Sequence, residues 1–153
     1  MLRSKRFYGS LSAVIMALIV FGALPARAQA AGPAHPWGHG PLKVLLEVDS
    51  ADQSSWHTAI AVSKHALHTL GVDNVKLEII AWGPGVRMML KSSPYAADVR
   101  SLALYGVRFV VCRTNLKVMH IQPSEREPGV RLVPDFLVEV ARRHQEGWLQ
   151  LKM

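Results

Sequence analysis

The sequence contains little cysteine and lacks the familiar motifs for nucleotide binding and dithiol chemistry. Its 153 residues include one cysteine, Cys112, so a disulfide within the chain and a Cys-x-x-Cys pair are both excluded. Gly83-Pro84-Gly85 is neither a GxGxxG motif nor a P-loop, because it lacks their spacing and the lysine. No histidine belongs to a recognisable cysteine-peptidase motif. No motif in the chain predicts a cofactor.

Acidic residues are also few, with 11 against 18 basic ones, which gives a net charge of +7. Half of the residues are hydrophobic and 19% are charged, a composition that excludes a largely disordered chain. The length is enough for one ordinary domain.

Residues 1–30 have the three-part pattern of a secretory signal peptide. Arg3, Lys5 and Arg6 precede an apolar run over residues 11–24, and small residues follow at the spacing that signal peptidase reads. Cleavage would start the mature chain at Gln29 or Ala31. The alternative is an uncleaved anchor, but the run is shorter than the 18 or more apolar residues that span a bilayer. We therefore expect a periplasmic or secreted protein without a stable membrane anchor after cleavage.

Removal of this segment changes the charge argument. It takes away four basic residues and no acidic one, which leaves a net charge of +3. A nucleic-acid partner is therefore not expected. Residues 31–41 are rich in proline, glycine and histidine and are expected to form a flexible leader. His35 and His39 lie in it with Trp37, but we assign them no function.

Short apolar runs and segments with helical periodicity alternate from residue 42 onward. Five strands are expected at residues 42–48, 75–82, 107–111, 130–133 and 148–151. Helices are expected from Ser54 or Ser55 to Leu70, from an N-cap at Ser93 to Tyr105, and over residues 135–146, with short helical turns at 86–90 and 116–120. This alternation predicts a three-layer α/β domain over residues 42–153, with a mostly parallel five-stranded sheet flanked by helices.

Ligands of such sheets bind outside the carboxyl ends of the strands. Three loops are expected at that edge, at residues 49–52, 83–85 and 112–115. Cys112 follows a valine-rich strand and precedes Arg113, Thr114 and Asn115. Free amide groups at a helix start and an adjacent cation both favour a thiolate, which is the nucleophilic form. The alternative is that Cys112 is a small hydrophobic residue that only fills the core.

Soft metal-binding side chains give a second alternative. Met88 and Met89, together with Met119 and His120 near Cys112, are the residue types that suit Cu(I). Core packing is the more common role of such methionines, and His65 with His68 on the first helix fits a solvated face. No resident metal site is therefore predicted from these residues.

Several stretches together resemble the DsrE/DsrF-like family, and in particular its small exported single-domain members. They are LKVLLEVD, the helix of Trp56, LEIIAWGPGVRMML, GVRFVVCRTNL and VPDFLVEVARRHQEGW. The resemblance spans about residues 42–151. Cys112 would fall on the cysteine that ends a central strand and carries sulfur in DsrE and TusD proteins. The segment RTNL after Cys112 differs from the alanine-rich segment of the cytoplasmic carriers.

The resemblance implies homotrimers or larger rings and persulfide carriage on Cys112. We therefore expect an exported sulfur-relay or sulfur-binding protein, a carrier more than a turnover enzyme, with an unknown sulfur donor and acceptor. Arg113 and the amides near Thr114 and Asn115 would stabilise the thiolate. The alternative is a non-catalytic exported oligomeric binding module. One form of this alternative binds Cu(I) through Cys112 and nearby Met or His.

Overall fold

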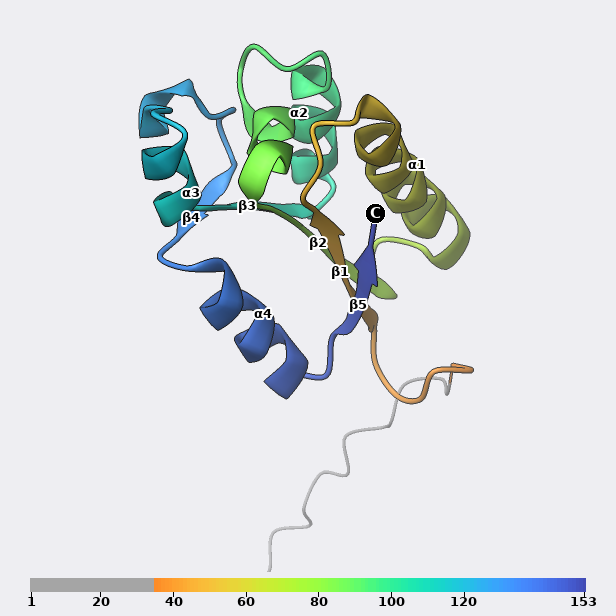
Figure 1. Cartoon of the computed structure of the whole chain (residues 1–153). Coiled ribbons are helices and arrows are strands. Elements are labelled where there is room, and N and C mark those ends of the chain that lie inside the picture. The colour runs from red at the N-terminus through yellow and green to blue at the C-terminus, as the bar shows by residue number, and fades with distance from the viewer. Residues whose placement is uncertain (1–34) are drawn as a thin grey trace, which may run out of the picture. The chain divides into compact units, whose positions relative to one another are not determined.

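The computed structural model describes residues 35–153 (Figure 1). The expected signal peptide and the first part of the leader lie outside the described residues. The order of the elements is β1 (Leu42–Val48), α1 (Gln53–Leu70), β2 (Val75–Ala81), η1 (Gly83–Met89), α2 (Ala96–Leu104), β3 (Arg108–Cys112), α3 (Arg113–Val118), η2 (Pro123–Glu125), β4 (Arg131–Val133), α4 (Phe136–Gln145) and β5 (Leu149–Lys152). Within these residues no helix is long and apolar enough to cross a bilayer.

All five strands run parallel in one sheet, in the order β4-β3-β2-β1-β5. A parallel sheet is covered on both faces, so its inner strands are apolar on both sides. The neighbouring residues Leu45 and Leu46 of β1 show this, because both are fully buried while pointing to opposite faces. The expected α/β class and five-stranded parallel sheet are confirmed.

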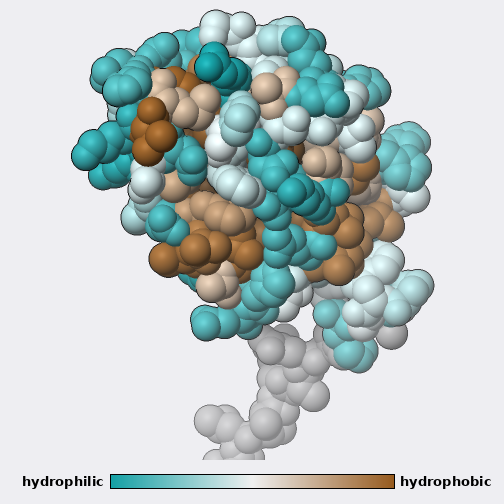
Figure 2. Space-filling view, viewed as in Figure 1, coloured by the Kyte–Doolittle hydropathy of each residue, from teal (hydrophilic) through white to brown (hydrophobic). Residues whose placement is uncertain are grey.

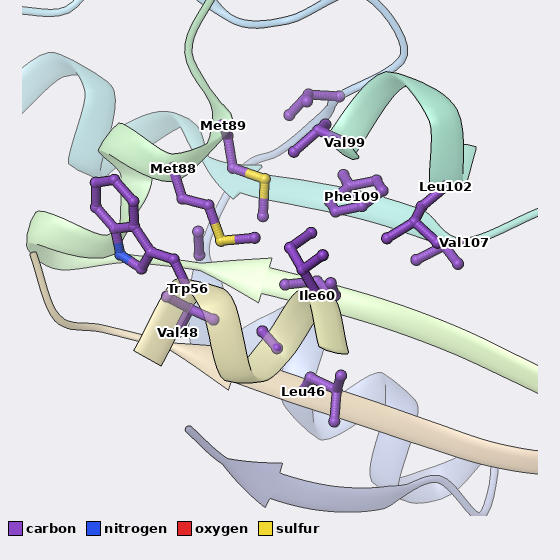
Figure 3. Close-up of a cluster of buried hydrophobic side chains, with 14 of the residues drawn as sticks. Leu46, Val48, Trp56, Ile60, Met88, Met89, Val99, Leu102, Val107 and Phe109 are labelled. Carbon is purple, nitrogen blue, oxygen red and sulfur yellow. The ribbon is translucent and has the colours of Figure 1, made fainter. Parts of the chain in front are cut away.

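The larger part of the core lies on the face covered by α1, α2, α3 and η1 (Figures 1 and 3). Figure 3 shows Leu46 and Val48 of β1 below the side chains that α1 and η1 contribute. Trp56 and Ile60 of α1 are buried here at helical spacing. The hydrophobic effect of this one face therefore provides most of the driving force for folding.

The opposite face is covered by α4 alone (Figure 1). Its apolar cluster is small: Leu45, Ile80, Val110 and Trp148 are buried, and Val133, Phe136 and Val140 pack against them. The expected three layers are present, but the second helical layer is one helix of 10 residues. The attachment of α4 therefore depends on polar contacts as well as on packing.

Two helix starts were predicted wrongly. Helix α1 is capped by Asp52, whose carboxylate accepts a hydrogen bond from the Ser54 amide at 2.9 Å, so the expected cap at Ser54 or Ser55 lies inside the helix. Helix α2 begins at Ala96 and not directly after Ser93, because residues 93–96 form a turn closed by Ala96 N donating to Ser93 O. The Asp52 side chain therefore sets the start of α1, whereas the N-cap residue of α2, Tyr95, makes no side-chain capping hydrogen bond.

Other boundaries also differ from the expectation. The turn at 83–85 continues into one 3-10 helix that ends at Met89. Strand β3 includes Cys112, and α3 starts at Arg113 and not at residue 116. Tyr105, expected as the end of its helix, is the exposed C-cap residue of α2. The described part of the leader contains a bridge between His35 and Gly38.

Candidate functional site

Cys112 lies where the direction of the chain changes between two neighbouring strands. It is the last residue of β3, and its register partner in β4 is Val133. The chain leaves β3 into α3, whose Leu116 belongs to the larger core, but it leaves β4 into α4 on the opposite face. Adjacent parallel strands that continue to opposite faces leave a crevice at their carboxyl ends. Cys112 is therefore placed at the topological switch point of the sheet.

The three expected loops meet at this edge. The Gly83 amide donates to Asn115 Oδ1 at 3.1 Å, and the Trp82 amide donates to Val48 O at 3.1 Å. Gly85 approaches the end of β1 so closely that a Cβ atom there would lie 2.3 Å from Val48 O. A side chain at this position is therefore excluded, and the glycine allows the chain after β2 to cross the end of β1.

The thiol of Cys112 is covered in this structure. Cys112 is 1% exposed, and its Sγ lies 3.7 Å from the carbonyl oxygen of Pro134, to which it donates. Thr114 Oγ1 donates to the same oxygen at 3.3 Å. Cys112 is also the N-cap residue of α3, and its side chain makes no capping hydrogen bond. The segment between β4 and α4 therefore forms the lid over the thiol.

Arg113 and Asn115 have different surroundings. Arg113 is exposed, and none of the ion pairs of residues 35–153 involves it. Its positive charge next to Cys112 is therefore not neutralised by a carboxylate of the described chain. Asn115 uses its side-chain oxygen to hold Gly83, so it fixes α3 against the turn after β2. The four predicted residues are thus adjacent, but only Cys112 and Thr114 share a hydrogen-bond acceptor.

The residues considered for Cu(I) are separated. Met88 and Met89 are buried in the core on the α1 face (Figure 3), whereas Cys112 points to the α4 face because it alternates with Val111. Met119 packs against the larger core, and His120 is exposed. The described residues contain no group of three or more His, Cys, Asp or Glu side chains that could hold a metal ion.

One buried carboxylate at the same edge, Glu47, was not expected from the sequence. Glu47 is 7% exposed on the face that carries Cys112. It accepts hydrogen bonds from Trp82 Nε1 at 2.8 Å and from Gln150 Nε2 at 2.5 Å. Trp82 also packs on Phe136, with ring centroids 4.9 Å apart. The sequence signal for this site was an acidic residue inside the apolar run of β1. Through its contacts with Glu47 and Phe136, Trp82 fixes the start of α4 beside the crevice.

A second buried cluster attaches the other end of α4. Glu78 is fully buried and pairs with Arg143 of α4 and with Arg108 of β3. Burial raises the pKa of Glu78, and the neighbouring Arg143 opposes this shift. Glu139 and Glu146 of the same segment also pair with Arg143. These ion pairs hold α4 on the sheet in addition to the small apolar cluster that it covers.

Comparison with known proteins supports the fold. No family model matches the chain, and no curated protein matches it either. A solved structure from Methanobacterium thermoautotrophicum, the protein of unknown function MTH1491, is 27% identical, with a TM-score of 0.69 over 73% of this chain and 99% of that one. The ychN protein from E. coli is 18% identical, with a TM-score of 0.57 over 73% of this chain and 99% of that one.

A third similar structure is the conserved protein of unknown function BT1422 from Bacteroides thetaiotaomicron. It is 12% identical, with a TM-score of 0.56 over 72% of this chain and 94% of that one. Almost the whole of each of these three proteins is matched, so the similarity covers a complete fold and not one motif. The chain shares the α/β fold of these proteins.

Proposed function

We propose that this protein is a DsrE/DsrF-like sulfur carrier that holds persulfide sulfur on Cys112. The observation that supports this most is the position of Cys112 at the switch point of the sheet, next to the unpaired cation of Arg113. Such crevices are where open α/β sheets bind their ligands. The protein would accept and release sulfur as a carrier, and it would turn over no substrate of its own.

The transfer is an exchange between sulfur atoms. The Cys112 thiolate attacks the terminal sulfur of a persulfide donor, R–S–SH. The donor S–S bond breaks, an S–S bond forms on Cys112, and R–S⁻ leaves, so that charge and electrons balance. An acceptor thiolate then attacks the terminal sulfur on Cys112, and the Cys112 thiolate is the leaving group. Arg113 and the amides of residues 114 and 115 would stabilise the anionic forms.

Loading requires the lid over Cys112 to open, because the thiol is buried. The lid joins β4, an edge strand of three residues, to α4, which covers a small apolar cluster. Segments with few buried contacts open with less free energy than the whole domain unfolds. We propose that Pro134 and the start of α4 move away from Cys112 when a donor binds.

We also propose that the chain is exported and forms homotrimers or larger rings. Hydrophobic side chains reach the surface in separate patches on the face shown in Figure 2. Exposed hydrophobic side chains include Leu137 and Val138 of α4 and Leu149 and Leu151 of β5. Burial of such side chains against other copies of the chain would favour assembly. The mass of the mature protein in solution tests the oligomer, and its N-terminal residue tests cleavage before Gln29 or Ala31.

Sulfur transfer is tested by loading and unloading. The folded protein is incubated with inorganic polysulfide, desalted and treated with cyanide, which takes the terminal sulfur as thiocyanate. We expect about one thiocyanate per chain. Arg113→Gln should load severalfold more slowly, because it removes the adjacent charge, whereas Lys91→Gln removes an exposed charge elsewhere and should load normally. No thiocyanate from the folded wild type would reject the proposal.

The burial of Cys112 supports one alternative, a non-catalytic oligomeric module in which the cysteine only packs. In that case the folded protein would not load, and its thiol would react only after global unfolding. Cu(I) titration tests the metal-binding form of this alternative. Stoichiometric binding that is lost in Cys112→Ser, without sulfur loading, would favour it, and binding no stronger than background would reject it.

A further inference from the structure

A basic pocket opens at the end of the sheet opposite to Cys112. Its lining residues come from the beginnings of β1, β2 and β3 and from the C-terminal end of α4. Figure 1 shows these segments at the end of the sheet away from α3. Its volume is about 480 Å³, within the range of small-molecule sites. Five basic side chains and one indole dominate its lining: Lys43, Lys76, Arg108, Arg142, Arg143 and Trp148. The carrier chemistry proposed for Cys112 uses none of them.

The two lysines of the pocket carry like charges on neighbouring strands. Lys43 and Lys76 are register partners on the adjacent strands β1 and β2, so their side chains leave the same face of the sheet. Like charges directly opposite each other destabilise a sheet. Lys43 Nζ donates to the backbone carbonyl of Glu146 at 2.8 Å, and among the described residues neither lysine pairs with a carboxylate.

The arginines of the pocket form ion pairs with the nearby carboxylates. Glu78 is shared by Arg108 and Arg143, and Glu139 and Glu146 are each shared by Arg142 and Arg143. Burial lowers the pKa of Arg108, and the positive charges of Arg143, Arg131 and Arg142 lower it further, against Glu78. Positive charge therefore remains in excess around the pocket.

Trp148 holds two of these cations in place. The guanidinium of Arg108 lies 5.1 Å from the ring centroid of Trp148, and that of Arg143 lies 4.7 Å from it. Cation–π contacts and the ion pairs with Glu78 fix both groups before any ligand arrives. Fixed cations bind an anion with a smaller loss of side-chain entropy than free ones do.

We propose that this pocket binds a small polyanion, a molecule that carries phosphate or sulfate groups. The anion would lie between Lys43 and Lys76 and contact the outer side of the Arg108 guanidinium. Such a ligand relieves the repulsion between the lysines and forms charge-assisted hydrogen bonds with them. Because the pocket is at the other edge of the sheet from Cys112, this inference does not depend on sulfur carriage.

The test uses inorganic pyrophosphate as the probe and the mature chain as the protein. Thermal unfolding is followed at rising pyrophosphate concentration, with sodium chloride at equal ionic strength as the control. Phosphate and sulfate in parallel arms show which oxyanion is preferred. We expect a saturable rise of the unfolding temperature with each oxyanion that binds, because a ligand of the folded state stabilises it.

Lys76→Gln is the deciding variant, because its side chain is exposed and its loss leaves no buried group unpaired. It should weaken pyrophosphate binding about tenfold, Lys76→Arg should retain binding, and Lys91→Gln should leave it unchanged. Equal shifts in chloride and pyrophosphate, or equal weakening by Lys76→Gln and Lys91→Gln, would overturn the proposal.

Discussion

Cys112 and Val133 are register partners at the ends of β3 and β4, and the chain leaves them toward opposite faces of the sheet. Because of this arrangement, the thiol lies in a crevice and is covered by the segment that follows β4. The residue after Val133 is Pro134, whose carbonyl oxygen accepts from both Cys112 and Thr114. The same backbone segment therefore creates the site and closes it.

The first prediction concerns opening of the lid. Asp135 caps α4 by accepting from the Leu137 amide at 2.8 Å, and Asp135→Ala should cost about 1 kcal/mol of helix stability. If Cys112 is reached by local opening at this helix start, alkylation of the native thiol should become about fivefold faster. The measurement is the rate of thiol labelling in the folded protein.

Asp52→Ala is the matched control. Asp52 caps α1 in the same way, through the Ser54 amide, so its loss has a similar cost for the whole domain. Labelling of Cys112 should be nearly unchanged in this variant. Equal acceleration by both substitutions would show that Cys112 is reached only by global unfolding, against the account of a local lid.

The second prediction concerns the buried ion pair under α4. Arg143→Met should destabilise the protein by about 3 kcal/mol in urea unfolding, because Glu78 is left buried with less compensation. Adding Glu78→Gln should restore part of the loss, since the uncompensated charge is then gone. A double variant that is as unstable as the sum of both single variants would show that the two side chains do not interact.

The third prediction concerns pH. Arg143 donates a hydrogen bond to Glu146, which holds the pKa of Glu146 below its ordinary value of 4.5. A carboxyl whose pKa is lowered by folding stabilises the protein above its unfolded pKa, and this contribution is lost as the pH falls through the folded pKa.

The wild type should therefore be more stable than Glu146→Gln at neutral pH, and the difference should shrink once the pH falls below 4.5. Urea unfolding of both proteins between neutral and acidic pH measures this difference. A difference that stays constant over this range would contradict the role of the Glu146 charge.

The fourth prediction concerns the close approach at Gly85. Gly85→Ala should destabilise the protein by about 3 kcal/mol, because the new Cβ meets the backbone carbonyl of Val48, which cannot move freely. Gly147→Ala is the comparison: its φ is +77° but nothing lies within 4 Å of the new Cβ, so it should cost only about 1 kcal/mol. Thermal unfolding of both variants distinguishes the clash from backbone strain.

The sheet and the position of Cys112 were predictable because they depend on local patterns. Apolar strands such as β1 alternate with helices, and this alternation favours a parallel sheet. The carboxyl ends of parallel strands lie at the same edge of the sheet, where Cys112 is found. The exact helix starts were not predictable, because Asp52, Ser54 and Ser55 are all good caps and the fold selects among them.

The buried charges could not be predicted from local patterns. Glu47 meets Gln150 across 103 residues, and Glu78 meets Arg143 across 65. Each acid stands out within an apolar strand, but the sequence gives no indication of its partner. The contact that covers Cys112 could not be predicted for the same reason, because Pro134 is 22 residues away in the sequence.

The most direct test of the central claim is the intact mass of the mature protein after incubation with polysulfide under native conditions. Cys112→Ser and the urea-unfolded wild type are measured beside it. We predict that the native wild type gains sulfur that a reductant removes, while Cys112→Ser gains none. A native protein that stays unmodified while the same chain gains sulfur in urea would contradict sulfur carriage on Cys112.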